Sequence, residues 1–147
     1  MENKITIIGG GASGMVAAIA ASRNGAKVTI YERMNRVGRK ILATGNGRCN
    51  LTNINLKGDN LQCVHGNNVE FANRVLKQFP VEETINFFEV LGIACKVEEG
   101  GRVFPMSDQA SSVLDVLRYE LKKLGVKVIC EKEIEKINRR GDKFIII

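Results

Sequence analysis

Three glycines near the start of the chain stand at the spacing G-x-G-x-x-G. Gly9, Gly11 and Gly14 follow an apolar, β-branched run, KITII, which is typical of a strand buried on both faces. They precede a helix-forming segment that is rich in alanine. A second β-branched run, KVTIY, comes next and ends at Glu32. This order of strand, glycine turn, helix and strand predicts a βαβ unit over about residues 1–35.

Each part of this unit has a physical role in binding a dinucleotide. Gly9 permits a tight turn off the strand, Gly11 lets a pyrophosphate approach the backbone, and Gly14 lets the helix pack close to the sheet. The first N–H groups of the helix, including those of Ala12 and Ser13, would point at the phosphates with the positive end of the helix dipole behind them.

An acidic residue also stands at the position that such a site requires. Glu32 follows the glycines by about twenty residues, where a carboxylate can accept hydrogen bonds from a ribose diol. It would repel a 2′-phosphate, which disfavours NADP, although Arg33 beside it keeps that nucleotide open. The glycines recognise an ADP moiety, so they alone do not distinguish FAD from NAD.

A polar segment follows the second strand. Residues 38–53 read GRKILATGNGRCNLTN and contain no carboxylate. Its glycines and asparagines can supply main-chain donors without bulky side chains, as the ribityl chain and flavin ring of FAD require. Lys40 and Arg48 could balance the pyrophosphate or the negative charge of a reduced flavin. We therefore expect a cofactor loop over about residues 36–55, and this loop favours FAD.

The same segment, after GGGASG and an ER pair, resembles the bacterial flavoprotein family of YhiN- and BaiN-like proteins, which are NAD(P)/FAD-dependent oxidoreductases. The stretch GRVFPMSDQASSVLDVLRYELKKLGV, residues 101–126, is similar to the next signature of that family. The resemblance implies FAD bound to a Rossmann-like domain. By motif position it implies contacts to the pyrophosphate from Gly9, Gly11, Ala12, Ser13 and Gly14, to the ribose from Glu32, and to the rest of the cofactor from Arg33, Lys40, Thr44, Gly45, Asn46, Gly47, Arg48 and Cys49.

The resemblance also implies an activity and a larger protein. A hydride would pass from NAD(P)H through FAD to a small unsaturated or carbonyl substrate. Members of the family are much longer, with a later substrate domain and a return segment that completes the FAD site. The chain ends at KFIII, within an apparent strand. We therefore expect residues 1–147 to be one FAD-binding domain, truncated at its C-terminal end, with the missing C-terminal part as its partner.

The remainder of the chain predicts helices and hairpins. The segment after Ser107, a candidate N-cap, predicts an amphipathic helix to Leu124 with one buried face. That face comprises Ala110, Val113, Leu114, Leu117, Leu121 and Leu124. We expect a loop at 55–68, helices at 71–79 and after Pro80, a buried strand at 126–130, and hairpins at 95–104 and 133–147.

In the helix after Pro80, Phe87 and Phe88 could stack on a flavin, although we favour core packing.

With the βαβ unit, the order of elements predicts an α/β fold. We expect a Rossmann-like, three-layer β-β-α domain, in which a parallel sheet carries a helix layer on one side and an antiparallel β layer on the other.

Charge leaves a second class of function open. The net charge is +6, and no acid stands between Glu32 and Asp59. A bound phosphate group explains the basic residues in that interval, although a solvated basic face remains an alternative. They are Arg33, Arg36, Arg39, Lys40 and Arg48. The alternative function is a nucleotide-binding or RNA-associated module without redox turnover. We consider nucleic acid the weaker choice, because two tyrosines and six phenylalanines supply few stacking side chains.

Other candidate chemistry is sparse. Cys49 could be a redox partner or nucleophile whose pKa the adjacent Arg48 lowers, or a small side chain packed against the ligand. We favour packing, since no second cysteine or histidine base is near it in the sequence. His65 is the single histidine, so we expect no metal site, and no catalytic acid or base can be named.

Location is inferred from the cysteines and from the hydropathy of the chain. The four cysteines form no CxxC pair and, without an export signal, indicate reduced thiols in a cytoplasmic protein. No apolar stretch approaches the roughly 20 residues of a membrane span, so we expect no membrane partner.

Overall fold

The computed structural model describes residues 3–56, 64, 66–141 and 143–147. The chain divides into two units. Unit 1 comprises Met1–Ile41 and Leu117–Ile147, and unit 2 comprises Leu42–Val116. None of the described helices is long and apolar enough to cross a membrane.

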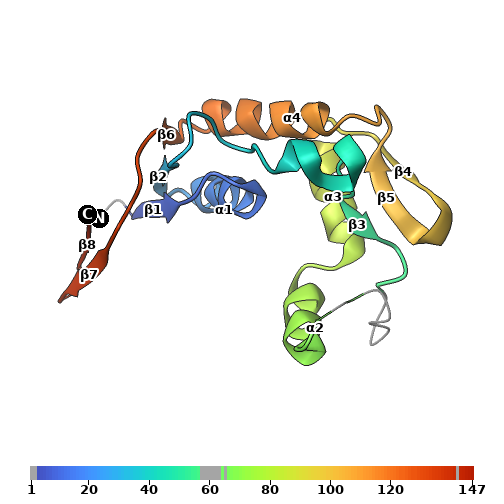
Figure 1. The fold of residues 1–147 in the computed structure, drawn as a ribbon, viewed down its shortest axis with the longest axis horizontal. Helices are drawn as coiled ribbons and strands as arrows, with labels where there is room; N and C mark the ends of the chain where they lie inside the picture. Colours follow the sequence, from blue (N-terminus) through green and yellow to red (C-terminus); the bar gives the residue numbers. More distant parts are fainter. Residues whose placement is uncertain (1–2, 57–63, 65, 142) are drawn as a thin grey trace. The chain divides into compact units, whose positions relative to one another are not determined.

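A parallel three-stranded sheet lies in unit 1, and its strands are labelled in Figure 1. Its order is β1-β2-β6, and the strands are Lys4–Ile8, Lys27–Tyr31 and Lys127–Ile129. Helix α1, Ala12–Arg23, connects β1 to β2 and packs against both. Alanine favours helix along α1, and Gly25 ends it at a φ of +80° that suits glycine. The predicted βαβ unit is confirmed.

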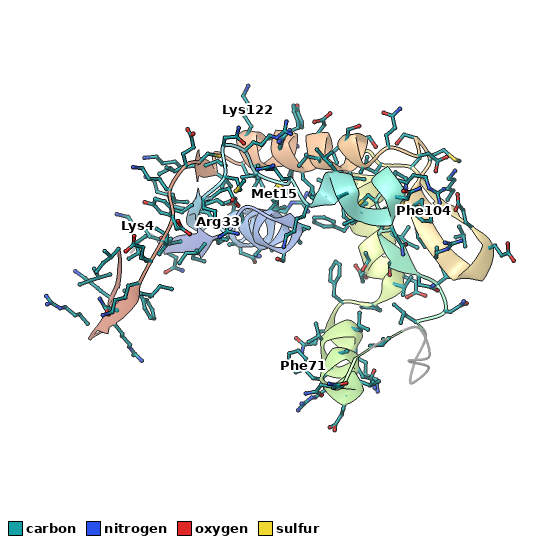
Figure 2. All side chains as sticks on the ribbon, in the orientation of Figure 1. Lys4, Met15, Arg33, Phe71, Phe104 and Lys122 are labelled. Atoms are coloured by element: carbon teal, nitrogen blue, oxygen red, sulfur yellow. The ribbon has the colours of Figure 1, made fainter. Side chains whose placement is uncertain are left out.

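The core of unit 1 includes the inner faces of α1 and β2. Met15, Ala18 and Ile19 of α1 are fully buried, as is Ile30 of β2. Figure 2 labels Met15 on its helix. Arg23 at the end of α1 donates two hydrogen bonds to one carboxylate oxygen of Glu120, at 3.2 and 2.8 Å. The buried Glu120 is therefore paired, as an ionised side chain in a core must be.

The expectation that the strands at 4–8 and 126–130 are buried is wrong. Ile5 and Ile8 of β1 are 40% and 46% exposed, and Val128 of β6 is 38% exposed. Both strands lie at the edges of the described sheet, where each pairs only with β2. A parallel strand is buried on both faces only when neighbouring strands and helices cover it, so edge positions leave these side chains accessible.

The hairpin predicted at 133–147 is confirmed in unit 1. Strands β7, Ile137–Arg140, and β8, Lys143–Ile146, pair antiparallel, with Arg139 opposite Phe144. Asp142 in the predicted turn lies outside the described residues. The parallel sheet, its helix and this hairpin confirm the α/β class.

Unit 2 contains an antiparallel sheet in the order β3-β5-β4. The strands are Thr52–Asn53, Arg102–Pro105 and Cys95–Val97. The last two form the hairpin predicted at 95–104, and its turn includes Gly100 at a φ of +75°. Phe104 of β5, labelled in Figure 2, is buried.

Two short helices precede this hairpin in the sequence. Helix α2, Val69–Gln78, begins two residues before the predicted start, because the side chain of Asn68 accepts a hydrogen bond from the Phe71 N–H and caps it. Only part of the loop predicted at 55–68 lies within the described residues. Helix α3, Val81–Val90, follows Pro80 as predicted. The Phe87 and Phe88 rings of α3 contact each other edge to face.

Helix α4, Ala110–Lys123, contains the predicted buried face, but its predicted start is wrong. Ala110, Val113, Leu114, Leu117 and Leu121 are buried, and Leu124 is half-buried. The Oγ of Ser107 accepts a hydrogen bond from the Gln109 N–H, outside the helix. Asp108 has a φ of +54°, and this left-handed conformation prevents the right-handed helix from starting at Ser107.

Candidate dinucleotide-binding site

The glycine turn between β1 and α1 has the geometry that the motif predicts. Gly9 leaves the strand at a φ of +97°, and its N–H donates to the Tyr31 carbonyl over 2.7 Å. A Cβ on Gly14 would lie 2.0 Å from the Gly9 carbonyl oxygen and 3.4 Å from Ile7 Cγ2. The predicted roles of Gly9 in the turn and of Gly14 in close packing are both confirmed.

Gly11 differs from its neighbours in having no internal requirement for glycine. Its φ is −75°, which any residue adopts, and a Cβ built on it meets no atom within 4 Å. Neither its backbone conformation nor packing against the described residues therefore explains why this residue is glycine. The open space beside the main chain fits a group that lies against Gly11, as the pyrophosphate of a dinucleotide would.

The first turn of α1 presents main-chain N–H groups at this corner. Gly11 is the N-cap and has no side chain to accept from the helix N–H groups, and no acidic residue lies in the first turn. Ala12, Ser13 and Gly14 provide those first N–H groups. Free N–H groups at the positive end of a helix dipole are suited to an anion.

The structure adds Gly10 to the corner, a residue that the sequence analysis missed. A Cβ on Gly10 would lie 2.3 Å from Val37 Cγ1, and the Gly10 carbonyl accepts from the Gly38 N–H over 2.8 Å. Gly10 therefore admits the segment after β2 rather than a ligand. The third glycine of the run GGG was the available signal, but the partners of Gly10 lie 22 residues or more along the chain.

Glu32 lies at the same corner, held by two main-chain donors. Its Oε2 accepts from the Gly10 N–H over 2.7 Å, and its Oε1 accepts from the Met34 N–H over 2.8 Å. The Glu32 N–H donates to the Ile129 carbonyl of β6, which fixes the backbone beneath the carboxylate. The structure thus brings Glu32 to the glycines, and its contact with a ribose remains a prediction.

The basic residues after Glu32 are exposed in unit 1. Arg33, Arg36, Arg39 and Lys40 all carry accessible side chains. Arg33 lies 3.8 Å from the carboxylate of Glu133, with both side chains about 70% exposed. Ion pairs this exposed are screened by water and add little to stability.

The segment from Thr44 to Cys49 belongs to unit 2 and has an unusual backbone. Left-handed φ values occur at Gly45, Asn46, Gly47 and Cys49, at +54°, +56°, +83° and +63°. Two internal hydrogen bonds close the loop, from the Arg48 N–H to the Gly45 carbonyl at 3.1 Å and from the Cys49 N–H to the Thr44 carbonyl at 3.0 Å. A Cβ on Gly45 would lie 2.6 Å from the Asn50 nitrogen.

Four charged side chains meet beside this loop and form what we call the charge quartet, Arg48, Lys96, Glu98 and Asp108. Arg48 Nη1 lies 2.8 Å from Glu98 Oε1 and 3.2 Å from Asp108 Oδ1. Lys96 Nζ lies 3.3 Å from Glu98 Oε1 and also bonds Asp108. The guanidinium carbon of Arg48 stands 4.1 Å from the centroid of the Phe104 ring.

Hydrogen bonds within the quartet lower the pKa values of its two carboxylates and raise that of its lysine. The bond from Arg48 lowers the pKa of Glu98, and the bond from Lys96 lowers the pKa of Asp108. The bond to Asp108 raises the pKa of Lys96. The quartet was not predicted from the sequence. The available signal was the i, i+2 spacing of Lys96 and Glu98, which places both side chains on one side of an extended chain.

The alternative in which Arg48 lowers the pKa of Cys49, which we did not favour, is contradicted. Burial raises the pKa of this thiol, while the Arg48 guanidinium is directed to Glu98 and Asp108. A buried, protonated thiol is a poor nucleophile, which agrees with the packing role we favour. Cys49, Cys95 and Cys130 are free thiols, and Cys63 lies outside the described residues, as does His65. Within the described ranges, no three His, Cys, Asp or Glu side chains gather as metal ligands.

Comparison with known proteins assigns the chain to a family. The model of the HI0933-like protein Rossmann domain matches residues 3–147, so the chain belongs to that family. This finding confirms the resemblance to YhiN- and BaiN-like flavoproteins and the Rossmann-like fold.

Two relatives and one solved structure extend this assignment. The chain is 49% identical over 146 residues to the 3-dehydro-bile acid delta(4,6)-reductase of Clostridium scindens, covering 98% of this chain and 35% of the relative. It is 33% identical over 128 residues to the ribosomal RNA dihydrouridine synthase of Escherichia coli, covering 87% and 31%. The chain thus spans about a third of the length of these curated relatives.

Among solved structures, the 3-ketosteroid-delta4-(5alpha)-dehydrogenase of Rhodococcus jostii in complex with 4-androstene-3,17-dione has a similar fold. The TM-score is 0.68 at 15% identity, over 98% of this chain and 44% of that one. At this identity the likeness concerns the fold alone.

Proposed function

We propose that this chain is the FAD-binding portion of a flavin-dependent oxidoreductase. Gly11 carries the proposal, because its ordinary φ and the open space around its Cβ position leave the glycine without a conformational or packing role among the described residues. Membership of a Rossmann-domain family and the glycine- and asparagine-rich loop support FAD as the dinucleotide. A cytoplasmic location belongs to the same proposal, supported by the free thiols among the described residues.

Each part of the corner has a role in this proposal. The main chain of Gly9 and Gly11 and the N–H groups at Ala12, Ser13 and Gly14 would hold the pyrophosphate, and Glu32 would accept hydrogen bonds from the ribose. When bound, FAD supplies two-electron chemistry between NAD(P)H and a substrate. Contacts from Arg33, Lys40 and the segment Thr44–Cys49 remain predictions from the family resemblance.

The names of the relatives favour one substrate class. A delta(4,6)-reductase of a 3-oxo bile acid and a dihydrouridine synthase both imply reduction of a carbon–carbon double bond that is conjugated with a carbonyl. We propose the same class for the whole protein that contains this chain, with a small molecule as substrate and NAD(P)H as donor. This chain aligns with about a third of each relative. The proposal about the substrate therefore concerns the complete protein.

The test uses the protein as its gene encodes it in full. We expect yellow protein with flavin absorbance, released FAD in its mass spectrum, and loss of both in the variant Gly11→Val, whose side chain would occupy the pyrophosphate position. Ala17→Val on the exposed face of α1 is the matched control and should retain FAD. Wild-type protein without flavin absorbance, even after addition of FAD, would refute the proposal.

Association with RNA is the second candidate function, favoured by the name of the Escherichia coli relative and by the basic charge of unit 1. In that case exposed cations such as Arg36 and Arg39 would contact phosphates, and binding would weaken as salt rises. An RNA mobility-shift assay separates the candidates. Gly11→Val should leave RNA binding largely intact, because the cations are unchanged, while it abolishes binding of FAD.

A further inference from the structure

The charge quartet defined above ties the Thr44–Cys49 loop to the rest of unit 2. The hydrogen bonds of the Arg48 and Cys49 N–H groups run within the loop and fasten it only to itself. The Arg48 side chain instead reaches Glu98 and Asp108, which are 50 and 60 residues away in the sequence. It is therefore a long-range connection between the loop and the β4–β5 hairpin region.

The loop needs such a connection because its backbone is unfavourable. Asn46 and Cys49 are not glycines, yet both have left-handed φ values. Residues other than glycine persist in that conformation only where surrounding contacts determine it. Asp108, one of the two carboxylates that bind Arg48, has a φ of +54° as well. The loop that carries Arg48 and its partner Asp108 therefore both have an unfavourable backbone conformation.

The chemistry of arginine suits this role better than a role as a free cation. A guanidinium can donate to two carboxylates while its planar face lies on an aromatic ring, which an ammonium cannot reproduce. Arg48 does both, through Nη1 and against Phe104. The quartet contains two cations and two carboxylates, so its charges cancel and it offers no net charge to a ligand.

We propose that Arg48 is a positioning residue, whose guanidinium is held on Phe104 by Glu98 and Asp108 so that the main chain of Thr44–Cys49 is fixed for the cofactor. This inference rests on the proposed function, since it assumes that the loop contacts FAD. It replaces the role in which Arg48 neutralises the cofactor directly. Side chains that lock the rotamers and loops of a site are required for tight binding, because small displacements of contacting atoms weaken it.

The test measures the dissociation constant of FAD for the full-length protein and its variants. Arg48→Lys and Glu98→Gln should each raise it on the order of tenfold, because each breaks the same contact. The double variant should raise it little beyond either single change, since coupled residues are not additive. A cation that acts on the cofactor predicts the reverse, because Arg48→Lys keeps its charge and Glu98→Gln removes a competing anion.

Arg102→Gln is the matched control. Arg102 lies 6.0 Å from the same Phe104 ring and donates to the Glu99 carbonyl rather than to a carboxylate. It should leave both FAD affinity and the visible spectrum of saturated protein unchanged. The quartet variants should alter the spectrum at saturation, which general loss of stability would not do.

The outcomes are distinguishable. Wild-type protein that binds no FAD would overturn the proposed function and this inference with it. Wild-type protein that binds FAD, with Arg48→Lys at the wild-type affinity or Glu98→Gln binding more tightly, would overturn the positioning role alone. Asp108→Asn provides a milder variant should Arg48→Lys fail to fold, and it should weaken binding in the same direction.

Discussion

The two units of the molecule fix their loops in different ways. In unit 1 the corner between β1 and α1 depends on the main chain, with close packing at Gly14 and a carboxylate, Glu32, that accepts from main-chain N–H groups. In unit 2 the side chain of Arg48 connects its loop to Glu98 and Asp108 through ion pairs. A backbone corner is sensitive to added atoms, whereas an ion-pair network is sensitive to protons and salt.

Charge composition follows the same division. Unit 1 contains 16 lysines and arginines against seven acids, and unit 2 contains six against nine. Two of the acids in unit 2, Glu98 and Asp108, hold Arg48 and Lys96, while basic side chains such as Arg36 and Arg39 in unit 1 are exposed. The basic excess of the chain therefore belongs to unit 1, where the proposed phosphate contacts also lie.

The substitution Gly14→Ala should have the largest effect on stability and tests the main-chain corner. Its Cβ would lie 2.0 Å from the Gly9 carbonyl oxygen, so α1 must move away from the end of β1. We expect the free energy of unfolding to fall by about 3 kcal/mol, as for severe overpacking. Urea denaturation without added FAD measures it. Gly11→Ala is the control and should cost at most about 1 kcal/mol; equal costs would show that packing does not distinguish the two glycines.

The corresponding change in unit 2 is Gly45→Ala, with a smaller expected effect. The residue has a φ of +54°, and a Cβ would lie 2.6 Å from the Asn50 nitrogen. Left-handed backbone and crowding together should lower the free energy of unfolding by about 2 kcal/mol. Gly47→Ala, with a φ of +83° and nothing within 4 Å, isolates the conformational part and should cost about 1 kcal/mol. If Gly47→Ala lowered the free energy of unfolding as much as Gly45→Ala, crowding at Gly45 would not explain the effect.

Acid should release the ion pairs of the quartet, and we expect this to be the smallest of the three effects. The pKa values of Glu98 and Asp108 are lowered from ordinary values of 4.5 and 3.8. Their contribution to stability is therefore fully present above those values and is lost as pH falls through the lowered ones. Side-chain NMR signals of Arg48 should shift below about pH 4. The double variant that combines Glu98→Gln with Asp108→Asn should lack this transition. Signals that stay constant until the whole chain unfolds would contradict the prediction.

Local patterns in the sequence predicted the βαβ unit well. The β-branched runs that became β1 and β2, the alanine-rich helix and Gly25 at its end all act through neighbouring residues. The same holds for the buried face of α4, because helical spacing alone selects Val113, Leu117 and Leu121. A known motif also placed Gly9 in the turn, Gly14 at the close contact and Glu32 beside the glycines, as the structure has them. Their contacts with a cofactor stay predictions.

The failures involve contacts between distant positions. Ser107 is a good N-cap by type, but the left-handed Asp108 delays the helix, and Asp108 is held by Lys96 and Arg48. The exposure of Ile5 depends on which strands flank β1, which the run KITII cannot reveal. Gly10 was missed because its need for glycine comes from Val37. Pairing across tens of residues leaves no local signal.

The two main-chain bonds to Glu32 have a consequence for recognition at the glycine corner. A free glutamate samples many rotamers, and fixing one costs up to about 2 kcal/mol of conformational entropy. Here the bonds from the Gly10 and Met34 amides restrict the side chain before any ligand arrives. A hydroxyl that approaches the carboxylate therefore meets acceptor lone pairs that are already oriented, and preorganisation of this kind increases affinity without an added contact.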